Sequence, residues 1–190
     1  MRKIISLWSV LVLLTVVWTM SAGAETVSPE KAKTAIVYFS KTGNTRQACE
    51  LLAKAISADL FELKVAKAPA AKGQLPEIEP AQIDLKPYSF VIVASPVWAA
   101  NLVPAVRAFL KNNALGGKNV VVLTTTNAPM PEQFQQKHKK FVGDAGAIIA
   151  GYYQLVMMEK KDDTPVPRAE AAIKKDTAAV VEEIRKVIQK

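Results

Sequence analysis

A short polar loop, Ser40–Thr45, has the composition of an anion-binding site. It reads Ser-Lys-Thr-Gly-Asn-Thr and lies between an apolar run and a helical pattern that opens at Thr45. Free N–H groups and the dipole at a helix N-terminus attract anions. Hydroxyl and amide side chains add donors, and Gly43 lets the backbone wrap closely around a ligand. The loop therefore predicts a phosphate site, and an ordinary helix cap made by Thr45 is the alternative.

A large aromatic side chain, Trp98, follows another apolar run, 89–94. A flat ring beyond the end of a strand can stack on an aromatic ligand. The alternative is a core tryptophan that closes the edge of the sheet. In open parallel sheets, ligands bind outside the carboxyl ends of the strands. We therefore expect the loops 40–45, 95–102 and 124–131 to form the binding site together.

The rest of the chain has the pattern needed to position these loops. Apolar runs typical of buried strands alternate with helical patterns, and the segment 66–87, rich in alanine and proline, predicts a loop with at most one helical turn. This alternation predicts an α/β fold with a parallel sheet and helices on both faces. The expected strands are 35–40, 60–65, 89–94, 119–124 and 147–158, the last bent at Gly151, and the expected helices are 45–56, 103–112, 132–142 and 168–188.

Two blocks of the sequence resemble the flavodoxins and their relatives. The run IVYFSKTGNT, which ends at Thr45, is similar to the family's phosphate-binding loop, S/T-x-T-G-x-T. The block Ser89–Trp98 is similar to its third strand and the flavin-facing loop that follows. The resemblance implies a flavodoxin-like three-layer fold over residues 34–190, with a five-stranded parallel sheet in the order 2-1-3-4-5, and FMN as a non-covalent cofactor. Carried over by position, it implies that Ser40, Thr42, Gly43, Asn44 and Thr45 hold the phosphate, that Pro96, Val97 and Trp98 lie against the isoalloxazine, and that Thr124, Thr125, Thr126 and Asn127 border its pyrimidine end.

The resemblance leaves more than one function open. We expect an electron carrier that meets redox partner proteins in the cell envelope, because the three loops offer no acid and base pair, and we predict no catalytic residue. The alternative is an FMN-dependent reductase of quinones or other small electron acceptors. Ala99 and Ala100 favour that alternative, since many relatives have a glycine there that eases a peptide rotation beside the flavin. A third possibility is a fold that has lost flavin and binds only a partner.

The first residues have the features of a secretory signal. Arg2 and Lys3 precede an apolar run, 4–20, and the small residues Ala22 and Ala24 suit signal peptidase. We expect residues 1–24 to be cleaved, with an uncleaved membrane anchor as the alternative, and the protein to be exported to the periplasm. We also expect it to meet the membrane only through this segment before cleavage. The net charge of +8 would become +6 after cleavage, because the segment carries two positive charges and no acids.

Composition excludes several other classes. The chain has one cysteine and one histidine, so an intramolecular disulfide is impossible and a cysteine- or histidine-built metal site is not expected. No nicotinamide fingerprint or P-loop occurs, and the moderate charge does not indicate a nucleic-acid partner. We expect Cys49 to be buried in the first helix, Lys137–Lys140 to be a solvated helix end, and Asp162–Asp163 to form a surface turn.

Overall fold

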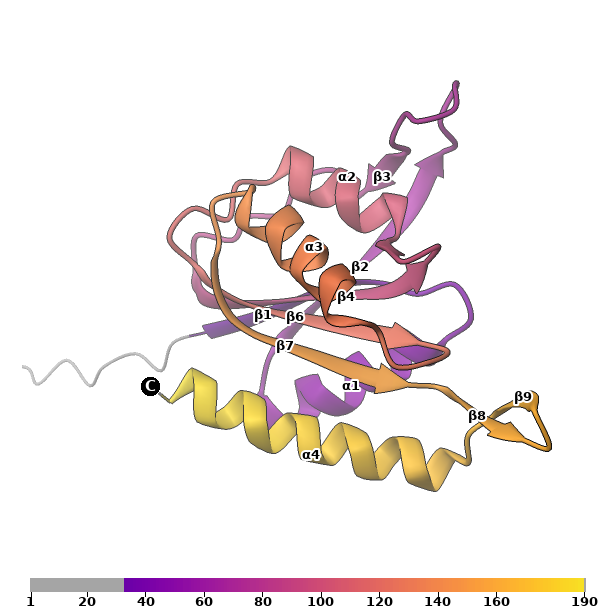
Figure 1. Ribbon diagram of the computed structural model, residues 1–190. Coiled ribbons are helices and arrows are strands. Elements are labelled where there is room, and N and C mark those ends of the chain that lie inside the picture. The colour runs from indigo at the N-terminus through magenta and orange to yellow at the C-terminus, as the bar shows by residue number, and fades with distance from the viewer. Residues whose placement is uncertain (1–32, 190) are drawn as a thin grey trace, which may run out of the picture. The chain divides into compact units, whose positions relative to one another are not determined.

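Five parallel strands form the centre of the structure, a computed structural model that describes residues 33–189 (Figure 1). Their order across the sheet, β2-β1-β4-β6-β7, is the predicted order 2-1-3-4-5. Apolar residues predominate in β1, β4, β6 and β7, and β6 is buried at every position after its first residue. The outer strand β2 is more polar and has one buried position. The strands are β1 (Lys33–Phe39), β2 (Asp59–Lys67), β4 (Tyr88–Trp98), β6 (Asn119–Thr126) and β7 (Ile148–Val156).

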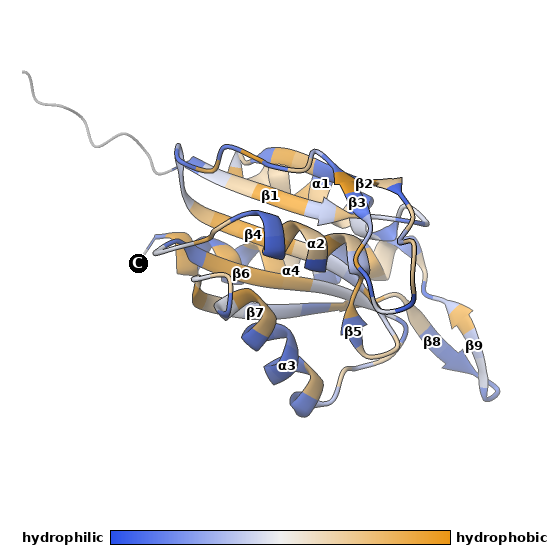
Figure 2. Ribbon diagram, turned by 90° about the horizontal axis from the view of Figure 1, so that it is seen from above, coloured by the Kyte–Doolittle hydropathy of each residue, from blue (hydrophilic) through white to orange (hydrophobic). Residues whose placement is uncertain are grey.

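Helices cover both faces of this sheet. The helices α1 (Asn44–Ile56) and α4 (Glu170–Ile188) pack on one face, and α2 (Pro104–Asn112) and α3 (Glu132–Gly143) on the other (Figure 1). Figure 2 shows the apolar residues gathered along the central strands. Alternate strand residues enter opposite cores, because successive side chains point to opposite faces. The predicted three-layer α/β fold is therefore confirmed.

Two short antiparallel strands extend the sheet beyond the prediction. The segment 66–87, expected to be a loop, contains β3 (Glu77–Glu79), which pairs with the outer part of β2. Ile78 is its one buried side chain, and Pro76 and Pro80 flank it, as suits an edge strand. Close to the expected ligand edge, β5 (Asn101–Leu102) folds back on the end of β4.

The last strand differs in length from the expected 147–158. It ends at Val156, and a two-stranded hairpin follows, formed by β8 (Met158–Lys161) and β9 (Thr164–Pro167). Asp162 and Asp163 form its tip with positive φ angles of 49° and 60°, as expected for a surface turn. The expected bend near Gly151 is a register shift between β6 and β7, which leaves Ala150 without a partner.

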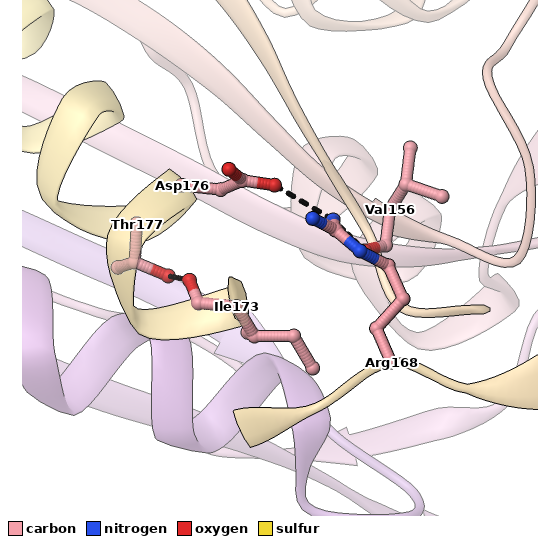
Figure 3. Close-up of polar contacts among 5 residues, drawn as sticks. All are labelled: Val156, Arg168, Ile173, Asp176 and Thr177. Atoms are coloured by element: carbon pink, nitrogen blue, oxygen red, sulfur yellow. Dashed lines mark hydrogen bonds and ion pairs between the residues drawn. The ribbon is translucent and has the colours of Figure 1, made fainter. Parts of the chain in front are cut away.

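The hairpin returns to the sheet through Arg168. Its Nη1 donates to the carbonyl of Val156 at 2.8 Å and to Oδ2 of Asp176 at 2.6 Å, so it joins the end of β7 to the second turn of α4 (Figure 3). The backbone N–H of Arg168 also donates to the carbonyl of Met157. This junction fixes where α4 begins.

The expected signal segment, 1–24, lies outside the described residues. Within residues 33–189, no helix is both long and apolar enough to span a membrane. All described residues belong to one compact unit.

Candidate functional site

The three loops singled out in the sequence meet in one cleft. It lies at the carboxyl ends of β1, β4 and β6 and encloses about 210 Å³. Its lining residues come from the loop after β1, the start of α1, the end of β4, the end of β6 and the residue after β7, and most are polar or aromatic. They are Lys41, Thr42, Asn44, Thr45, Pro96, Val97, Trp98, Thr125, Thr126, Asn127 and Met157. Of the predicted site residues, nine line this cleft, and Ser40, Gly43 and Thr124 do not.

The phosphate-loop residues are arranged around the start of α1. Gly43 is the N-cap, with a left-handed φ of 94°, and no side chain caps the helix. The first turn holds no acidic residue, so its N–H groups and the helix dipole are available to an anion. The alternative, an ordinary helix cap made by Thr45, is wrong, because the Thr45 side chain does not cap the helix. Its Oγ1 is instead 2.8 Å from Oγ1 of Thr125 in a buried hydrogen bond.

Ser40 carries a polar atom that the protein itself leaves unsatisfied. Its Oγ is buried and has no hydrogen-bond partner. Buried hydroxyl groups nearly always have a partner, and Ser40 is the first residue of the loop that is expected to attract an anion. An unpaired buried hydroxyl is expected in a ligand-free binding site, where the ligand would supply the missing hydrogen bond.

Trp98 lies at the open side of the cleft. Its side chain is 42% exposed, so the alternative of a core tryptophan is wrong. The Phe39 ring meets it edge-on at a centroid distance of 5.9 Å, and Lys41 Nζ lies 5.4 Å from the centroid of the Trp98 ring. Lys41 was not predicted as a site residue, although its place inside the loop was a signal that could have identified it.

The threonines at the end of β6 divide between the two faces of the sheet. Thr125 points toward α1 and bonds to Thr45, whereas Thr124 faces the other side, where its Oγ1 lies 3.2 Å from the Tyr152 hydroxyl. This alternation follows from the two-residue period of a strand. Met157, also missed, reaches the cleft because it directly follows β7 and its N–H donates to the carbonyl of Thr126.

Residues Lys137–Lys140 were expected to form a solvated helix end, but the histidine among them is not solvated. His138 is fully buried, and its Nε2 lies 3.2 Å from the carbonyl oxygen of Ala100, in the turn that follows Trp98. Lys137 and Lys140, by contrast, are exposed. Sequence reasoning failed here because the residues that bury His138 are distant in the chain.

The described residues offer little other reactive chemistry. Cys49 is buried as expected, and burial raises the pKa of its thiol far above the usual range, which makes a thiolate nucleophile unfavourable. Within residues 33–189, no three His, Cys, Asp or Glu side chains are grouped closely enough to hold a metal ion. The cleft is thus a site for an anionic and aromatic ligand, built from neutral donors, one lysine and a tryptophan.

Comparison with known proteins places this cleft in context. An uncharacterised protein of Archaeoglobus fulgidus is 26% identical over 133 residues, which cover 67% of this chain and 88% of that protein. The structure is similar to a flavoprotein from Lactobacillus acidophilus solved in complex with FMN, with a TM-score of 0.55 and 22% identity over 65% of this chain and 93% of the other. It is also similar to oxidised flavodoxin 2 from Bacillus cereus, with a TM-score of 0.51 and 19% identity over 82% of this chain and 99% of that one.

A family profile gives the assignment directly. The profile described as the flavodoxin domain matches residues 35–147, which run from β1 to the residue before β7 and include all three loops of the cleft. That match covers more than half of the chain and agrees with both the fold and the resemblance seen in the sequence. The chain therefore belongs to the flavodoxin domain family.

Proposed function

We propose that this protein binds FMN in the cleft and carries electrons between redox partners in the cell envelope. The observation that carries the proposal is the cleft itself, which brings an uncapped helix N-terminus and an exposed tryptophan to one edge of the sheet. FMN has a phosphate at one end and a flat aromatic system at the other, and it supplies the electron-transfer chemistry when bound. The FMN complex of the similar L. acidophilus flavoprotein supports this choice of cofactor.

The loop after β1 fits the phosphate end. The N–H groups at the start of α1 have no side-chain cap, the Ser40 hydroxyl has no partner, and Thr42 and Asn44 line the cleft. Thr45 has a different task, because its hydroxyl is shared with Thr125. It ties the start of α1 to the end of β6, and so keeps two loops of the cleft together.

The opposite part of the cleft fits a flavin ring. Trp98 presents an exposed aromatic surface beside Pro96 and Val97, and stacking on such a ring stabilises a flat ligand. Thr126 and Asn127 offer polar groups on the β6 side of the same cleft. Lys41 lies over Trp98, and its ammonium group adds positive charge near an anionic cofactor.

The ionisable groups of the cleft favour a carrier. Among the described residues that line it, Lys41 is the only one with an ionisable side chain. A reductase of small molecules that needs general acid or base catalysis would require a group that exchanges protons near neutral pH. A carrier needs only a bound flavin and a surface for its partners. The basic composition of the chain favours acidic partner proteins.

An FMN-dependent reductase of quinones or other small acceptors is the second candidate, and one observation favours it. Both carbonyls of the Ala99–Ala100 turn accept hydrogen bonds, one from Asn101 Nδ2 at 2.8 Å and one from His138. The turn is therefore held in one conformation. The peptide rotation that eases one-electron chemistry in flavodoxins would have to break these contacts.

The first experiment is a titration of the purified full-length protein with FMN, in which binding is measured by visible absorbance and, separately, by equilibrium dialysis. We expect saturable binding and much weaker binding of riboflavin, which lacks the phosphate. Equal affinity for both ligands would contradict the phosphate site, and no binding of either would contradict the cofactor. Reduction of the loaded protein by an electron donor, followed by oxidation with a quinone or with an electron-accepting protein, separates the two candidate functions.

The second experiment tests the cell-envelope location. Residues 1–24 are fused to a passenger enzyme that is active only after export, and the general secretion pathway is inhibited. We expect export of the passenger that stops under inhibition, because Arg2-Lys3 is not a twin-arginine pair. The control carries Leu11→Arg and Leu14→Arg, which interrupt the apolar run. A passenger that stays in the cytoplasm with the unchanged segment would contradict the proposed location.

A further inference from the structure

A buried histidine supports the turn that carries Trp98. The chain has one histidine, His138, and its side chain is fully buried although its neighbours Lys137 and Lys140 are exposed. Buried polar atoms nearly always have a hydrogen-bond partner, and an unpaired ring nitrogen would destabilise the fold. The contacts of these two nitrogens therefore show what the residue holds in place.

Both ring nitrogens are occupied, and the partners fix the position of the hydrogen. Nε2 lies 3.2 Å from the carbonyl oxygen of Ala100, which can only accept, so Nε2 carries the hydrogen. Burial lowers the pKa of His138 and favours the neutral ring. Nδ1 then accepts from the Tyr152 hydroxyl, 2.9 Å away, and Thr124 Oγ1 lies 3.2 Å beyond it. Hydrogen bonds of one direction thus run from the Tyr152 hydroxyl on β7 through His138 on α3 to the Ala100 carbonyl in the turn.

The turn at the end of this series has a strained backbone. Trp98 and Asn101 pair across the β4–β5 hairpin, and the two residues between them, Ala99 and Ala100, have φ angles of 46° and 58°. Positive φ angles at both central positions suit a tight hairpin, but they are unfavourable for any residue with a Cβ atom. Such a conformation persists only where its surroundings hold it.

We propose that His138 is a positioning residue for the cleft. Its Nε2–H, oriented by Tyr152, holds the Ala100 carbonyl and keeps the Ala99–Ala100 turn left-handed, so that Trp98 stays at the open side of the cleft. The role for FMN rests on the proposed function, whereas the support of the turn does not. Asn101 holds the other carbonyl of the turn, so α3 and the hairpin each secure one peptide.

The tautomer gives a direct test in the ligand-free full chain. Because His138 is the only histidine, labelling histidine with ¹⁵N gives one pair of ring signals. We expect a neutral ring with hydrogen on Nε2 at neutral pH in the wild-type protein, and a mixture of tautomers in Tyr152→Phe. A ring that is protonated at neutral pH, or that carries its hydrogen on Nδ1, would overturn the proposal.

Substitution tests the consequence for Trp98 and for binding. All variants in this test, and their reference protein, carry Trp8→Phe and Trp18→Phe, so that Trp98 is the only tryptophan. His138→Leu keeps an apolar side chain in the buried space but removes the donor. We expect a red shift of Trp98 emission in the ligand-free protein and an FMN Kd raised about tenfold, as for one lost hydrogen bond. His138→Gln, which keeps an N–H donor, should behave closer to wild type.

Rescue separates positioning from simple packing. Ala100→Gly removes the Cβ that makes the left-handed turn unfavourable, so it should restore most of the emission and the affinity in the His138→Leu background. Failure of Ala100→Gly to restore them, or a His138→Leu protein with unchanged emission and Kd, would overturn the proposal. Where His138→Leu does not fold, His138→Gln and Tyr152→Phe provide the same comparison. A wild-type protein that does not bind FMN would contradict the proposed function. The tautomer of His138 and the emission of Trp98, both measured without ligand, would still show whether His138 supports the turn.

Discussion

Two hydroxyl groups between the end of β1 and the first turn of α1 have opposite surroundings. The Ser40 hydroxyl is buried without a partner, whereas the Thr45 hydroxyl is buried and shared with Thr125. An unsatisfied buried polar group costs free energy in the ligand-free protein, and a satisfied one does not. The sequence places both residues in the same motif, but in the structure only the Thr45 hydroxyl has a partner within the protein. We therefore expect Thr45 to stabilise the fold and Ser40 to contribute to ligand binding.

Ser40→Ala should therefore separate binding from stability. Removal of an unpaired hydroxyl should leave the free energy of unfolding unchanged or slightly higher, while a lost bond to a charged phosphate should cost roughly 1.5–3 kcal/mol of FMN binding. Riboflavin binding should not change. Urea unfolding and ligand titration measure both effects.

Thr45→Val is the contrasting variant for that experiment. It leaves the Thr125 hydroxyl buried without its partner, so it should lower the free energy of unfolding by roughly 1–3 kcal/mol. A Ser40→Ala protein that loses stability to the same extent would show that the Ser40 hydroxyl already has a structural partner.

At the scale of elements, the start of α1 depends on one glycine. Gly43 occupies the N-cap position with a φ of 94°, and a Cβ atom there would meet no neighbour within 4 Å. Any cost of substitution must therefore come from the backbone and not from crowding. Gly43→Ala should lower the free energy of unfolding by roughly 1–2 kcal/mol and weaken FMN binding, because the first turn of α1 would shift.

Gly116 provides the matched control for this change. It also has free space around it, but its φ is not positive. Gly116→Ala should be neutral or slightly stabilising, because it reduces the entropy of the unfolded chain. Equal losses of stability in both variants, measured by urea unfolding, would contradict the backbone argument.

The placement of α4 depends on Arg168, which bonds to the carbonyl of Val156 and to Asp176 (Figure 3). The Asp176 side chain is 44% exposed, so solvent weakens the ion pair itself. The bond to the Val156 carbonyl has the larger effect, because that acceptor would lose its partner.

Arg168→Met, which keeps the aliphatic part of the side chain, should therefore cost roughly 1–3 kcal/mol of unfolding free energy. Asp176→Asn should cost less. Thermal and urea unfolding of both variants, with backbone hydrogen exchange in α4, would check this order. If Asp176→Asn is the more harmful change, the ion pair and not the carbonyl bond secures the helix.

For the whole molecule, the parts that could be predicted are those with a strong local signal. The central strands were found because their apolar runs are long, and their order followed from the family resemblance. The strand β3 was missed because three residues with one buried side chain, Ile78, give no period. Residues 95–102 were expected to form a loop, but the tight β4–β5 hairpin within it was missed because Ala99 and Ala100 give no turn signal. The burial of His138 depends on Tyr152 and Ala100, which come from other elements.

The titration of buried rings should limit the pH range in which the molecule is most stable. Burial raises the pKa of all four tyrosines of the chain. For Tyr88, burial and the hydrogen bond to Asp59 raise the pKa to about 12. Burial lowers the pKa of His138 below its usual 6.5, and the nearby Lys137 acts in the same direction. The folded protein therefore favours the neutral form of each of these groups.

The directions of these pKa shifts predict that the free energy of unfolding has a plateau near neutral pH and falls at both lower and higher pH. A raised tyrosine pKa contributes stability that is complete below the unfolded pKa of about 10 and is lost as the pH rises toward the folded value. A lowered histidine pKa contributes stability that is complete above about 6.5 and is lost as the pH falls through the folded value. For these groups, the free energy of unfolding should be highest between these limits.

Urea unfolding over a pH series, combined with the ultraviolet signal of tyrosinate, tests this plateau. In the folded protein at pH 10, we expect little ionised tyrosine, and above that pH ionisation and loss of stability should rise together. Tyr88→Phe should reduce the alkaline fall, because a tyrosine whose pKa is raised to about 12 in the folded protein is then absent. His138→Gln should reduce the acid fall below about pH 6.5. Tyrosines that ionise at their ordinary pKa without loss of stability would show that their hydroxyl groups are accessible to solvent in the folded state.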